Sequence, residues 1–436
     1  MNRKLNSNIE TIFLMSDVEN QIISSKFVKE IVKLKGDIKK FTTKSTIKSL
    51  KEKARFFSVL TRWFDYNDTF LAKEWAHPSD NIGTIFSYFI ENNNFKVSTF
   101  IDSLIKMYEI QGCLALGTSL NKKGYDHVFY VKLASASVFS SLISNNYSEI
   151  SKRTVNNMLL DGRSLRAYRH EPNVGKRKSW AAGDAVSRGI ELASISEFED
   201  EIYSEIQKDE NWGFEKVFLN GENLSFGKDL NDWVIENVLF KVLYPAEFHG
   251  QSAIEASVKL SDLYKEREQE IEGIIIETHE PAIRIISNKD KLKNASDRDH
   301  SLEFMVAAGL LFKEVNSKTY EDNFSGLKQI ENLRRKIKVQ ENKEFTENYY
   351  DISKRHIANT VYFEYNDGSF SKKETVETPI GHPNRREEAE PLLKQKFINN
   401  MSSHFPEERA KDIWEKILLI DVDSEFKEVI KLLSND

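Results

Sequence analysis

The 436-residue sequence contains one cysteine, Cys113, only 8 prolines and no long apolar run. A single cysteine excludes an intramolecular disulfide, a cysteine-rich zinc site and an iron–sulfur cluster held by several thiolates. No stretch approaches the roughly 18 consecutive apolar residues that a membrane-spanning helix needs. The sequence therefore predicts a protein of a reducing compartment, without a membrane partner and without an iron–sulfur cofactor.

Charge of one sign is also lacking, because 62 Lys and Arg residues face 68 Asp and Glu residues and leave a net charge of -6. No general positive field attracts nucleic acid, so nucleic acid is not an expected partner. The first residues, MNRKLNSNI, are basic but lack the apolar core of a secretory signal. We expect a cytoplasmic protein, with the mitochondrial matrix as the alternative if the source is eukaryotic.

Helical patterns dominate the first 240 residues. Apolar side chains recur on one helical face from Ile101 to Tyr108, which predicts a helix with a buried face. Small residues alternate with bulky ones from 131 to 143, a pattern that is typical of closely packed helices. Further helices are predicted over 154–160 and 181–194, and a lysine-rich helix over 20–55.

After about Phe240 the pattern changes, because β-branched runs and a turn sequence join the helices. The turn Asn366-Asp367-Gly368 predicts a hairpin. Strands are predicted at 274–276, 360–365 and 369–376, a buried helix at 302–312, and further helices after His382. This part is therefore predicted to be a smaller α+β module, after which the chain returns to helices.

A basic segment, DGRSLRAYRHEPNVGKRKSW (161–180), contains six cations and two acids. On an acidic protein this local excess suits an anion with several carboxylates or phosphates, because guanidinium groups bind planar carboxylates in pairs of hydrogen bonds. The alternative is a solvated loop. The cations are Arg163, Arg166, Arg169, Lys176, Arg177 and Lys178.

A second segment, WFDYNDTFLAKEWAHPSDN (63–81), places Asp65, Asp68, His77 and Asp80 beside aromatic side chains. Carboxylates and an imidazole in apolar surroundings are candidates for proton transfer. The alternative is a helix end followed by a turn. No HExxH or EF-hand pattern is present, so we predict no metal site.

Lys241 lies between Phe240 and Val242 in an apolar run. Such a lysine must reach solvent, pair with an anion or have a lowered pKa.

Six segments resemble, in this order, those of the MmgE/PrpD family: HPSDN, GYDHVFYVKLAS, DGRSLRAYRH, RKSWAAGDAVSR, WVIENVLFKVLYPAEFHGQ and IGHPNRR. The resemblance implies a mainly α-helical fold with a large helical domain and an inserted α+β lid. It places the helical domain at 1–237 and 384–436, the lid at 238–383, and implies a homodimer.

The resemblance also implies a metal-independent dehydration of 2-methylcitrate to 2-methyl-cis-aconitate, a step of propionate catabolism. By similarity, His77 and Asp65 form the proton-transfer pair, and His127 is a second acid or base. If His77 transfers a proton, we expect its pKa to lie near neutrality. The expected carboxylate-binding residues are Arg169, Lys178, Lys241 and His249.

The sequence departs from the family pattern at some positions. Glu247 stands where the related cis-aconitate decarboxylase has a histidine, for which His249 could substitute, and Pro281 replaces a usual cysteine, which predicts a kink or a strand edge. The segment before the DYNDT motif is also short and matches poorly. Two alternatives therefore stay open: a weak or inactive relative that binds tricarboxylates, and a dehydratase or decarboxylase acting on citrate or cis-aconitate.

Overall fold

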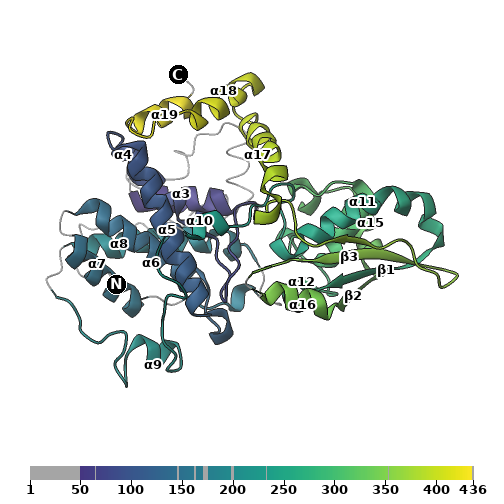
Figure 1. The fold of residues 1–436 in the computed structure, drawn as a ribbon, viewed down its shortest axis with the longest axis horizontal. Helices are drawn as coiled ribbons and strands as arrows, with labels where there is room; N and C mark the ends of the chain where they lie inside the picture. Colours follow the sequence, from purple (N-terminus) through teal and green to yellow (C-terminus); the bar gives the residue numbers. More distant parts are fainter. Residues whose placement is uncertain are drawn as a thin grey trace, which may run out of the picture. The chain divides into compact units, whose positions relative to one another are not determined.

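The computed structural model describes residues 50–63, 65–144, 147–161, 164–169, 175–197, 201–231, 233–351 and 353–434. Most regular elements are helices, and one four-stranded sheet accompanies them (Figure 1). The mainly α-helical class is thus confirmed. The helix predicted over 20–55 lies outside the described residues, except for its end, which belongs to α3 (Leu50–Arg62).

The helical part, as we call the elements from α3 to α10, surrounds one hydrophobic core. Phe89, Met107, Phe129 and Val186 are among its fully buried side chains. After α3, its helices are α4 (Ile82–Glu91), α5 (Val97–Gly117), α6 (Val128–Ile143), α7 (Tyr147–Asp161), α8 (Arg177–Ser196), α9 (Phe214–Phe218) and α10 (Trp233–Asn237), with short 3₁₀ turns at Pro78–Asn81, Asn121–Lys123 and Ala167–Arg169.

The predicted close approach of helices is found between α6 and α8. A Cβ atom on Gly189 of α8 would lie 3.0 Å from the carbonyl oxygen of Lys132 on α6. Ala134 and Ala136 of α6 are fully buried. Small side chains at this crossing therefore let the two backbones come together, as the interleaved pattern of 131–143 predicts.

The α+β part, as we call the elements from α11 to β4, contains the sheet, whose strand order is β2-β1-β3-β4. Strand β1 pairs in parallel with β2, with Ile274 opposite Ile337, and antiparallel with β3, with Ile274 opposite Phe363. The elements are α11 (Gln251–Arg267), β1 (Ile271–Thr278), α12 (Glu280–Ile286), α13 (Ala295–Arg298), α14 (Leu302–Phe312), α15 (Leu327–Arg334), β2 (Ile337–Glu341), α16 (Lys343–Tyr350), β3 (Asn359–Tyr365) and β4 (Glu374–Val376), with 3₁₀ turns at Phe248–Gly250, Glu268–Glu270 and Ser317–Tyr320.

The predicted strand and hairpin are confirmed, because β1 contains the isoleucine run and β3 pairs antiparallel with β4. The buried helix predicted over 302–312 is α14, with the same bounds. Its apolar residues are buried almost all round, and the side chain of Ser301 accepts a hydrogen bond from the Phe304 amide at its start. A second hydrophobic core forms here from the sheet, α11 and α14.

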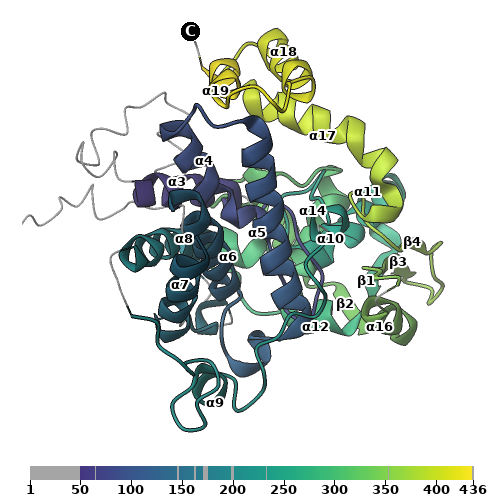
Figure 2. The same ribbon diagram turned by 60° about the vertical axis from the view of Figure 1, so that its left-hand side comes forward.

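The C-terminal helices return to the helical part, where α19 lies near α4 (Figure 2). Backbone hydrogen bonds join Val97 to Ser424 (2.9 Å) and Phe426 to Phe95 (2.7 Å), and the Phe426 ring enters the first core. These helices are α17 (Arg386–Met401), α18 (Glu407–Leu418) and α19 (Lys427–Leu433), preceded by a 3₁₀ turn at Pro383–Arg385. The contacts are consistent with the predicted domain boundaries, which themselves stay a prediction.

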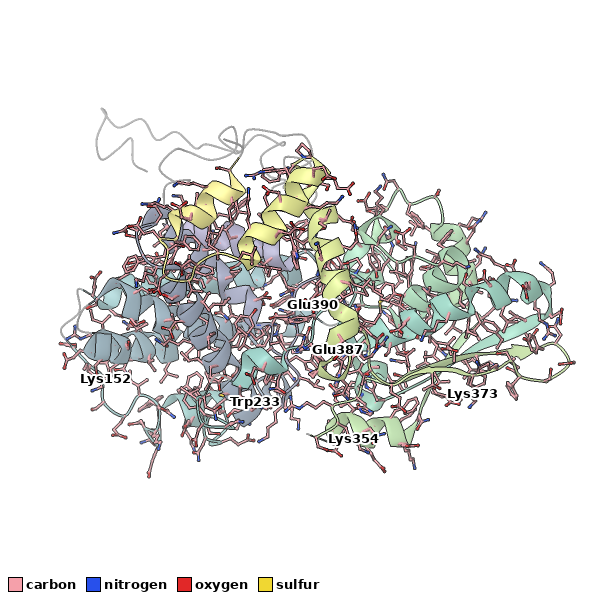
Figure 3. All side chains as sticks on the ribbon, turned by 45° about the horizontal axis from the view of Figure 1, so that its top comes forward. Lys152, Trp233, Lys354, Lys373, Glu387 and Glu390 are labelled. Atoms are coloured by element: carbon pink, nitrogen blue, oxygen red, sulfur yellow. The ribbon has the colours of Figure 1, made fainter. Side chains whose placement is uncertain are left out.

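Helix α17, marked by Glu387 and Glu390 in Figure 3, connects the two parts. Lys396 on this helix donates hydrogen bonds of 2.7 Å to the carbonyl oxygens of Tyr66 and Lys241. Gly381, just before the helix, has a φ of 100° and packs against the backbone of Phe240. A side chain would collide there, so this glycine helps to hold the segment that carries Lys241.

Pro281 occupies the first turn of α12, where a missing amide hydrogen costs nothing. The predicted kink or strand edge at this position is therefore wrong. Among the described residues, no helix is long and apolar enough to span a membrane.

Candidate active site

A cavity of about 60 Å³, here called the central cavity, gathers residues from the helical part and from the α+β part. Five of the seven predicted site residues line it: Asp65, His77, His127, Arg169 and Lys241. The other lining residues are Arg62, Trp75, Arg166, Glu247, Phe248, Ile285 and His300. Residues predicted from two separate segments, the acidic one at 63–81 and the basic one at 161–180, thus line the same cavity.

Asp65 and Lys241 form a buried ion pair in the wall of the cavity. The Nζ atom of Lys241 lies 2.8 Å from both the carbonyl oxygen and Oδ1 of Asp65. Asp65 has a φ of 49°, a left-handed conformation that is costly for a residue other than glycine. Although burial raises the pKa of Asp65, the charges of Lys241 and Arg62 outweigh it and hold this pKa well below its usual range. Asp65 is therefore a fixed carboxylate.

His77 follows α3 and precedes the 3₁₀ turn Pro78–Asn81, for which its side chain forms no cap. Its Nδ1 atom lies 2.7 Å from the carbonyl oxygen of Asp68. A carbonyl oxygen can only accept, so Nδ1 carries the hydrogen and Nε2 carries the lone pair. Burial, and then the charge of Arg62, lower the pKa of His77 well below its usual value. The pKa near neutrality expected from the sequence is therefore wrong.

His127 lies at the start of α6, and its ring centroid is 5.4 Å from that of His77. Both of its ring nitrogens are buried and make no hydrogen bond to a described residue, although Nδ1 lies 3.2 Å from Oδ1 of Asp126. Burial lowers the pKa of His127 well below its usual value despite this nearby carboxylate. The ring is thus neutral, and its polar atoms are free for a ligand.

Arg169 faces the cavity but also pairs with Asp126, through a very short contact from Nε and a 3.2 Å hydrogen bond from Nη2. Asp126 has a lowered pKa, since the charge of Arg169 outweighs the effect of burial. Arg62 lies between Asp65 and Asp80, at 3.7 and 3.6 Å, and its buried Nη1 atom makes no hydrogen bond within the part of the chain that the structure describes. Guanidinium groups therefore line one side of the cavity.

Lys178 and His249 do not line the cavity, but each contacts a residue that does. Nζ of Lys178 lies 2.5 Å from Oδ1 of Asp299 and 2.9 Å from Nδ1 of His300, which itself lines the cavity. Nδ1 of His249 lies 2.8 Å from Oε1 of Glu247, and Nε2 lies 3.2 Å from the hydroxyl of Tyr349. Both residues reach the cavity through a neighbour, and their predicted contact with substrate stays a prediction.

Sequence reasoning missed several lining residues. Arg62 could have been noticed because it precedes Asp65 by three residues, although the predicted helix ended at 55 and the observed α3 continues to Arg62. His300 follows Asp299 in a short polar segment, where a single histidine is more often structural than functional. Trp75, Phe248 and Ile285 show no distinguishing pattern, because an apolar side chain in a cavity wall resembles one in a core.

The remaining cations of the basic segment have other contacts. The guanidinium of Arg177 stacks over the rings of Trp180 and Tyr168, at 4.4 and 5.1 Å. Arg166 lines the cavity, 4.0 Å from Glu74, and Arg163 lies outside the described residues. The segment is therefore neither wholly a solvated loop nor wholly a binding site.

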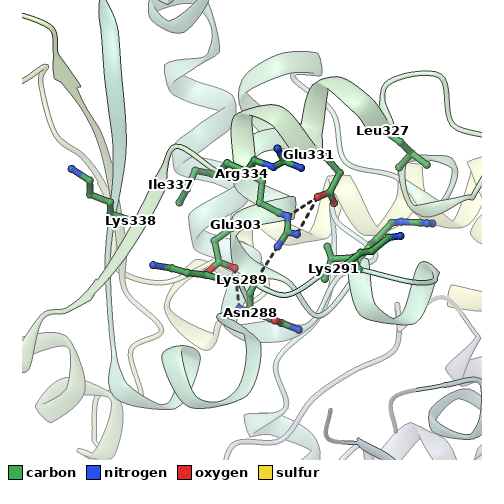
Figure 4. Close-up of a pocket in the computed structure, with 12 residues that line it drawn as sticks. Asn288, Lys289, Lys291, Glu303, Leu327, Glu331, Arg334, Ile337 and Lys338 are labelled. Atoms are coloured by element: carbon green, nitrogen blue, oxygen red, sulfur yellow. Dashed lines mark hydrogen bonds and ion pairs between the residues drawn. The ribbon is translucent and has the colours of Figure 1, made fainter. Parts of the chain in front are cut away.

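Larger cavities lie elsewhere in the described part of the chain. One of about 610 Å³ belongs to the α+β part alone and contains none of the predicted site residues; Arg334 there pairs with Glu331 at 3.0 Å (Figure 4). Another, of about 760 Å³, shares Trp75, Arg166 and Ile285 with the central cavity and adjoins it. Within the described chain, no group of three or more His, Cys, Asp or Glu side chains is arranged to hold a metal ion.

Comparisons with known proteins agree with this geometry. The MmgE/PrpD N-terminal domain matches residues 31–227, and the MmgE/PrpD C-terminal domain matches residues 244–421. The 2-methylcitrate dehydratase of Escherichia coli (strain K12) is 42% identical over 369 residues, which cover 82% of this chain and 76% of the relative.

Two further relatives come from other groups of organisms. The 2-methylcitrate dehydratase of Cupriavidus necator is 40% identical over 367 residues, covering 81% of this chain and 76% of the relative. The mitochondrial 2-methylcitrate dehydratase of Yarrowia lipolytica is 38% identical over 382 residues, covering 84% of this chain and 73% of the relative. With matches of this extent on both sides of the central cavity, the chain belongs to the MmgE/PrpD family.

Proposed function

We propose that this protein is a hydro-lyase that removes water from 2-methylcitrate to give 2-methyl-cis-aconitate. The relatives from bacteria and fungi that carry this name are 38 to 42% identical to it over most of its length. The observation that carries the proposal at the level of chemistry is a neutral His77 whose Nε2 lone pair lies in a cavity lined by cations.

The elimination requires a base for a C–H bond next to a carboxylate and a proton donor for the departing hydroxyl. His77 fits the base, since its Nδ1–H is engaged by a carbonyl oxygen and its low pKa keeps Nε2 unprotonated. The hydrogen bond from Nδ1 to the carbonyl oxygen of Asp68 fixes the orientation of the ring, which efficient proton transfer requires. The proton moves to Nε2, the C–H electron pair forms the double bond, and the C–O bond breaks.

His127 fits the proton donor. A neutral imidazole carries one N–H group, and neither ring nitrogen of His127 is engaged by another described residue. The departing hydroxide takes this proton and leaves as water. The positive charge of the neighbouring Arg169 stabilises the negative charge that develops in this step, either on the transient His127 anion or on the departing hydroxide.

Cations supply the remaining requirement, which is to hold three carboxylates and the negative charge that develops on one of them. Arg62, Arg166 and Arg169 line the cavity together with Lys241. Among the described residues the Nη1 atom of Arg62 makes no hydrogen bond and only a 3.6 Å ion pair with Asp80, so it can donate to a substrate carboxylate. Guanidinium groups bind carboxylates in planar pairs of hydrogen bonds, which also orients the reacting carbon.

A cavity of about 60 Å³ holds a few water molecules and not a tricarboxylate. Substrate must therefore displace side chains on entry. Trp75 and Ile285 line both this cavity and the adjoining one of about 760 Å³, so these two side chains are where access is expected. Closure over the substrate would then exclude water, which strengthens every electrostatic interaction inside.

The experiment that tests the proposal is incubation of purified protein with 2-methylcitrate, citrate and cis-aconitate in parallel, with NMR identification of the products. Conversion of 2-methylcitrate to 2-methyl-cis-aconitate faster than the other two reactions is the expected result. Release of carbon dioxide from cis-aconitate would indicate a decarboxylase instead. Binding of all three without conversion would indicate an inactive relative.

We also propose a homodimer, which light scattering on the purified protein tests. A cytoplasmic location is proposed because a chain with one cysteine suits a reducing compartment, with the mitochondrion as the alternative, because the Yarrowia lipolytica relative is named mitochondrial.

A further inference from the structure

We infer that the cavity of about 760 Å³ that adjoins the central cavity, here called the vestibule, captures the tricarboxylate substrate from solvent through its cationic side chains and delivers it to the central cavity. The inference rests on the proposed function, because it assigns an entry route and a first binding site to the same substrate. It also gives a function to Lys73 and Lys122, which the proposed reaction itself does not use.

The vestibule lies between the helical part and the α+β part. Ala72 and Leu116 line it on one side, and Pro281 of α12 and Tyr349 of α16 line it on the other. Its volume is in the usual range for sites that hold a small organic ligand, whereas the 60 Å³ of the central cavity is not. A tricarboxylate can therefore be held in the vestibule before the central cavity opens for it.

Cationic side chains predominate in the vestibule wall, where the structure shows five cations and one acid. The acid, Glu280, is already engaged. Its Oε1 atom accepts a 2.8 Å hydrogen bond from Nε of Arg284, and its Oε2 atom accepts one of 3.2 Å from the hydroxyl of Tyr350. The other cations thus have no acidic counterpart among the lining residues that the structure describes; they are Lys73, Lys122, Arg166 and Arg355.

Lys73 and Lys122 are the cations that an anion arriving from solvent meets first. Both are exposed, and neither forms an ion pair within the described part of the chain. The Nζ atom of Lys73 donates a 3.2 Å hydrogen bond to the carbonyl oxygen of Gly117, which carries no net charge. The positive charge of both lysines is therefore available to attract an anion.

The overall charge of the chain opposes the approach of the substrate. A net charge of -6 repels an anion with three carboxylates at long range. A local group of cations in a cavity concentrates the electric field and raises the rate of encounter with an anion. Salt should weaken this effect, because the Debye length falls from about 30 Å at 0.01 M to about 3 Å at 1 M.

Arg166 extends the group of cations from the vestibule into the central cavity. It lines both cavities, as do Trp75 and Ile285. Burial, and then the charge of Arg169, lower the pKa of Arg166 from its usual value, so the two guanidinium groups are close enough to interact. A carboxylate bound to Arg166 in the vestibule would therefore reach the cations of the central cavity once Trp75 and Ile285 move aside.

The test is the rate of ligand capture in the double variant Lys73→Gln/Lys122→Gln. The probe is tricarballylate, a tricarboxylate without the hydroxyl group, and stopped-flow mixing follows its binding through tryptophan fluorescence, since Trp75 lines both cavities. At about 0.01 M salt the association rate constant should fall about 3- to 10-fold, while the dissociation rate constant changes less than about twofold. At about 1 M salt the variant and wild type should associate at the same rate.

The matched control is Lys289→Gln/Lys291→Gln, which changes the net charge by the same amount. These two exposed lysines line the cavity of about 610 Å³ in the α+β part (Figure 4). The control should associate with tricarballylate nearly as fast as wild type. An equal fall in the control would show that only the net charge matters, and an unchanged association rate in the vestibule variant would show that the lysines do not act on capture; either result overturns the inference.

A steric variant tests the route without changing any charge. Ala72 lines the vestibule but not the central cavity, so Ala72→Trp should narrow the route and leave the final binding site intact. Association and dissociation should then slow by the same factor, with the Kd from calorimetry unchanged. Unchanged rates would mean that the ligand enters elsewhere, and a wild-type protein that does not bind tricarballylate would also overturn the inference.

The inference and the proposed function fail in different ways. If tricarballylate is captured as described but 2-methylcitrate is not converted, the proposed function fails and the vestibule remains the entry site for tricarboxylates. If 2-methylcitrate is converted but capture does not depend on Lys73, Lys122 or the width of the vestibule, the proposed function remains and the vestibule inference fails.

Discussion

Lys241 holds Asp65 at two points, because its Nζ atom donates 2.8 Å hydrogen bonds to both the carbonyl oxygen and Oδ1 of that residue. The two oxygens converge on one ammonium group while the backbone of Asp65 is left-handed. A buried lysine thus fixes both the charge and the unusual conformation of a carboxylate in the cavity wall. Their separation of 176 residues shows that this pairing depends on the whole fold.

Lys241→Met should be strongly destabilising. It leaves the Asp65 carboxylate buried with Arg62 at 3.7 Å as the remaining cation close to it, and breaking a buried ion pair on one side costs about 3 kcal/mol or more. Urea unfolding followed by circular dichroism measures the loss. A free energy of unfolding within experimental error of wild type would contradict this account of the pair.

The double variant Asp65→Asn/Lys241→Met is the matched control. Removing both charges together should recover much of the lost stability, since a buried ion pair contributes little net free energy compared with neutral groups. Turnover should stay lost, because both side chains line the cavity. Recovery of activity together with stability would mean that the pair only supports the fold.

Glu74 provides a test of pH-dependent stability. Burial raises its pKa to about 7, whereas an unfolded glutamate titrates near ~4.3. Between these values the folded chain keeps a proton that the unfolded chain has released, so the stability falls as the pH rises through this window and is constant above it.

Glu74→Gln should remove this dependence, so that the stability of the variant relative to wild type is greater at pH 8 than at pH 4 by on the order of 3 kcal/mol. Urea unfolding across this pH range measures the difference. The exposed Glu201→Gln is the control. An identical pH dependence in wild type and Glu74→Gln would show that Glu74 is ionised in the folded protein.

Cys113 should be dispensable for activity. It is buried in the helical core, its Sγ donates to Oε1 of Glu109 at 3.3 Å, and burial raises its pKa to about 12. A thiol with this pKa does not supply the thiolate that a metal or cluster needs. Turnover of Cys113→Ser, and of wild type dialysed against EDTA, should equal that of untreated protein, whereas loss on chelation would contradict a metal-independent reaction.

The element types were predictable from the sequence, and the geometry of the site only in part. The isoleucine run, the Asn-Asp-Gly turn and the apolar 302–312 segment specify their own local structure. Contacts such as Lys178 with His300 join residues 122 positions apart, so no local pattern indicates them. The low pKa of His77 was also unpredictable, because it depends on complete burial and on the charge of Arg62.

The pH profile of activity should reflect the low pKa of His77. A base that stays unprotonated well below its usual value should keep kcat/KM level as the pH falls through 6.5, since about half of an unperturbed histidine would be protonated there. The acid limb should therefore lie below that pH. A limb centred near pH 6.5 that disappears in His77→Gln would contradict the assignment of a lowered pKa.

The most direct measurement is kcat for 2-methylcitrate in wild type and in His77→Gln, with melting temperatures recorded for both. If Nε2 of His77 takes the proton, kcat should fall roughly 10²- to 10⁴-fold while the melting temperature stays close to that of wild type. An active wild type together with near-normal turnover in His77→Gln would contradict the central claim and would leave His127 as the remaining histidine of this ring pair to act as the base.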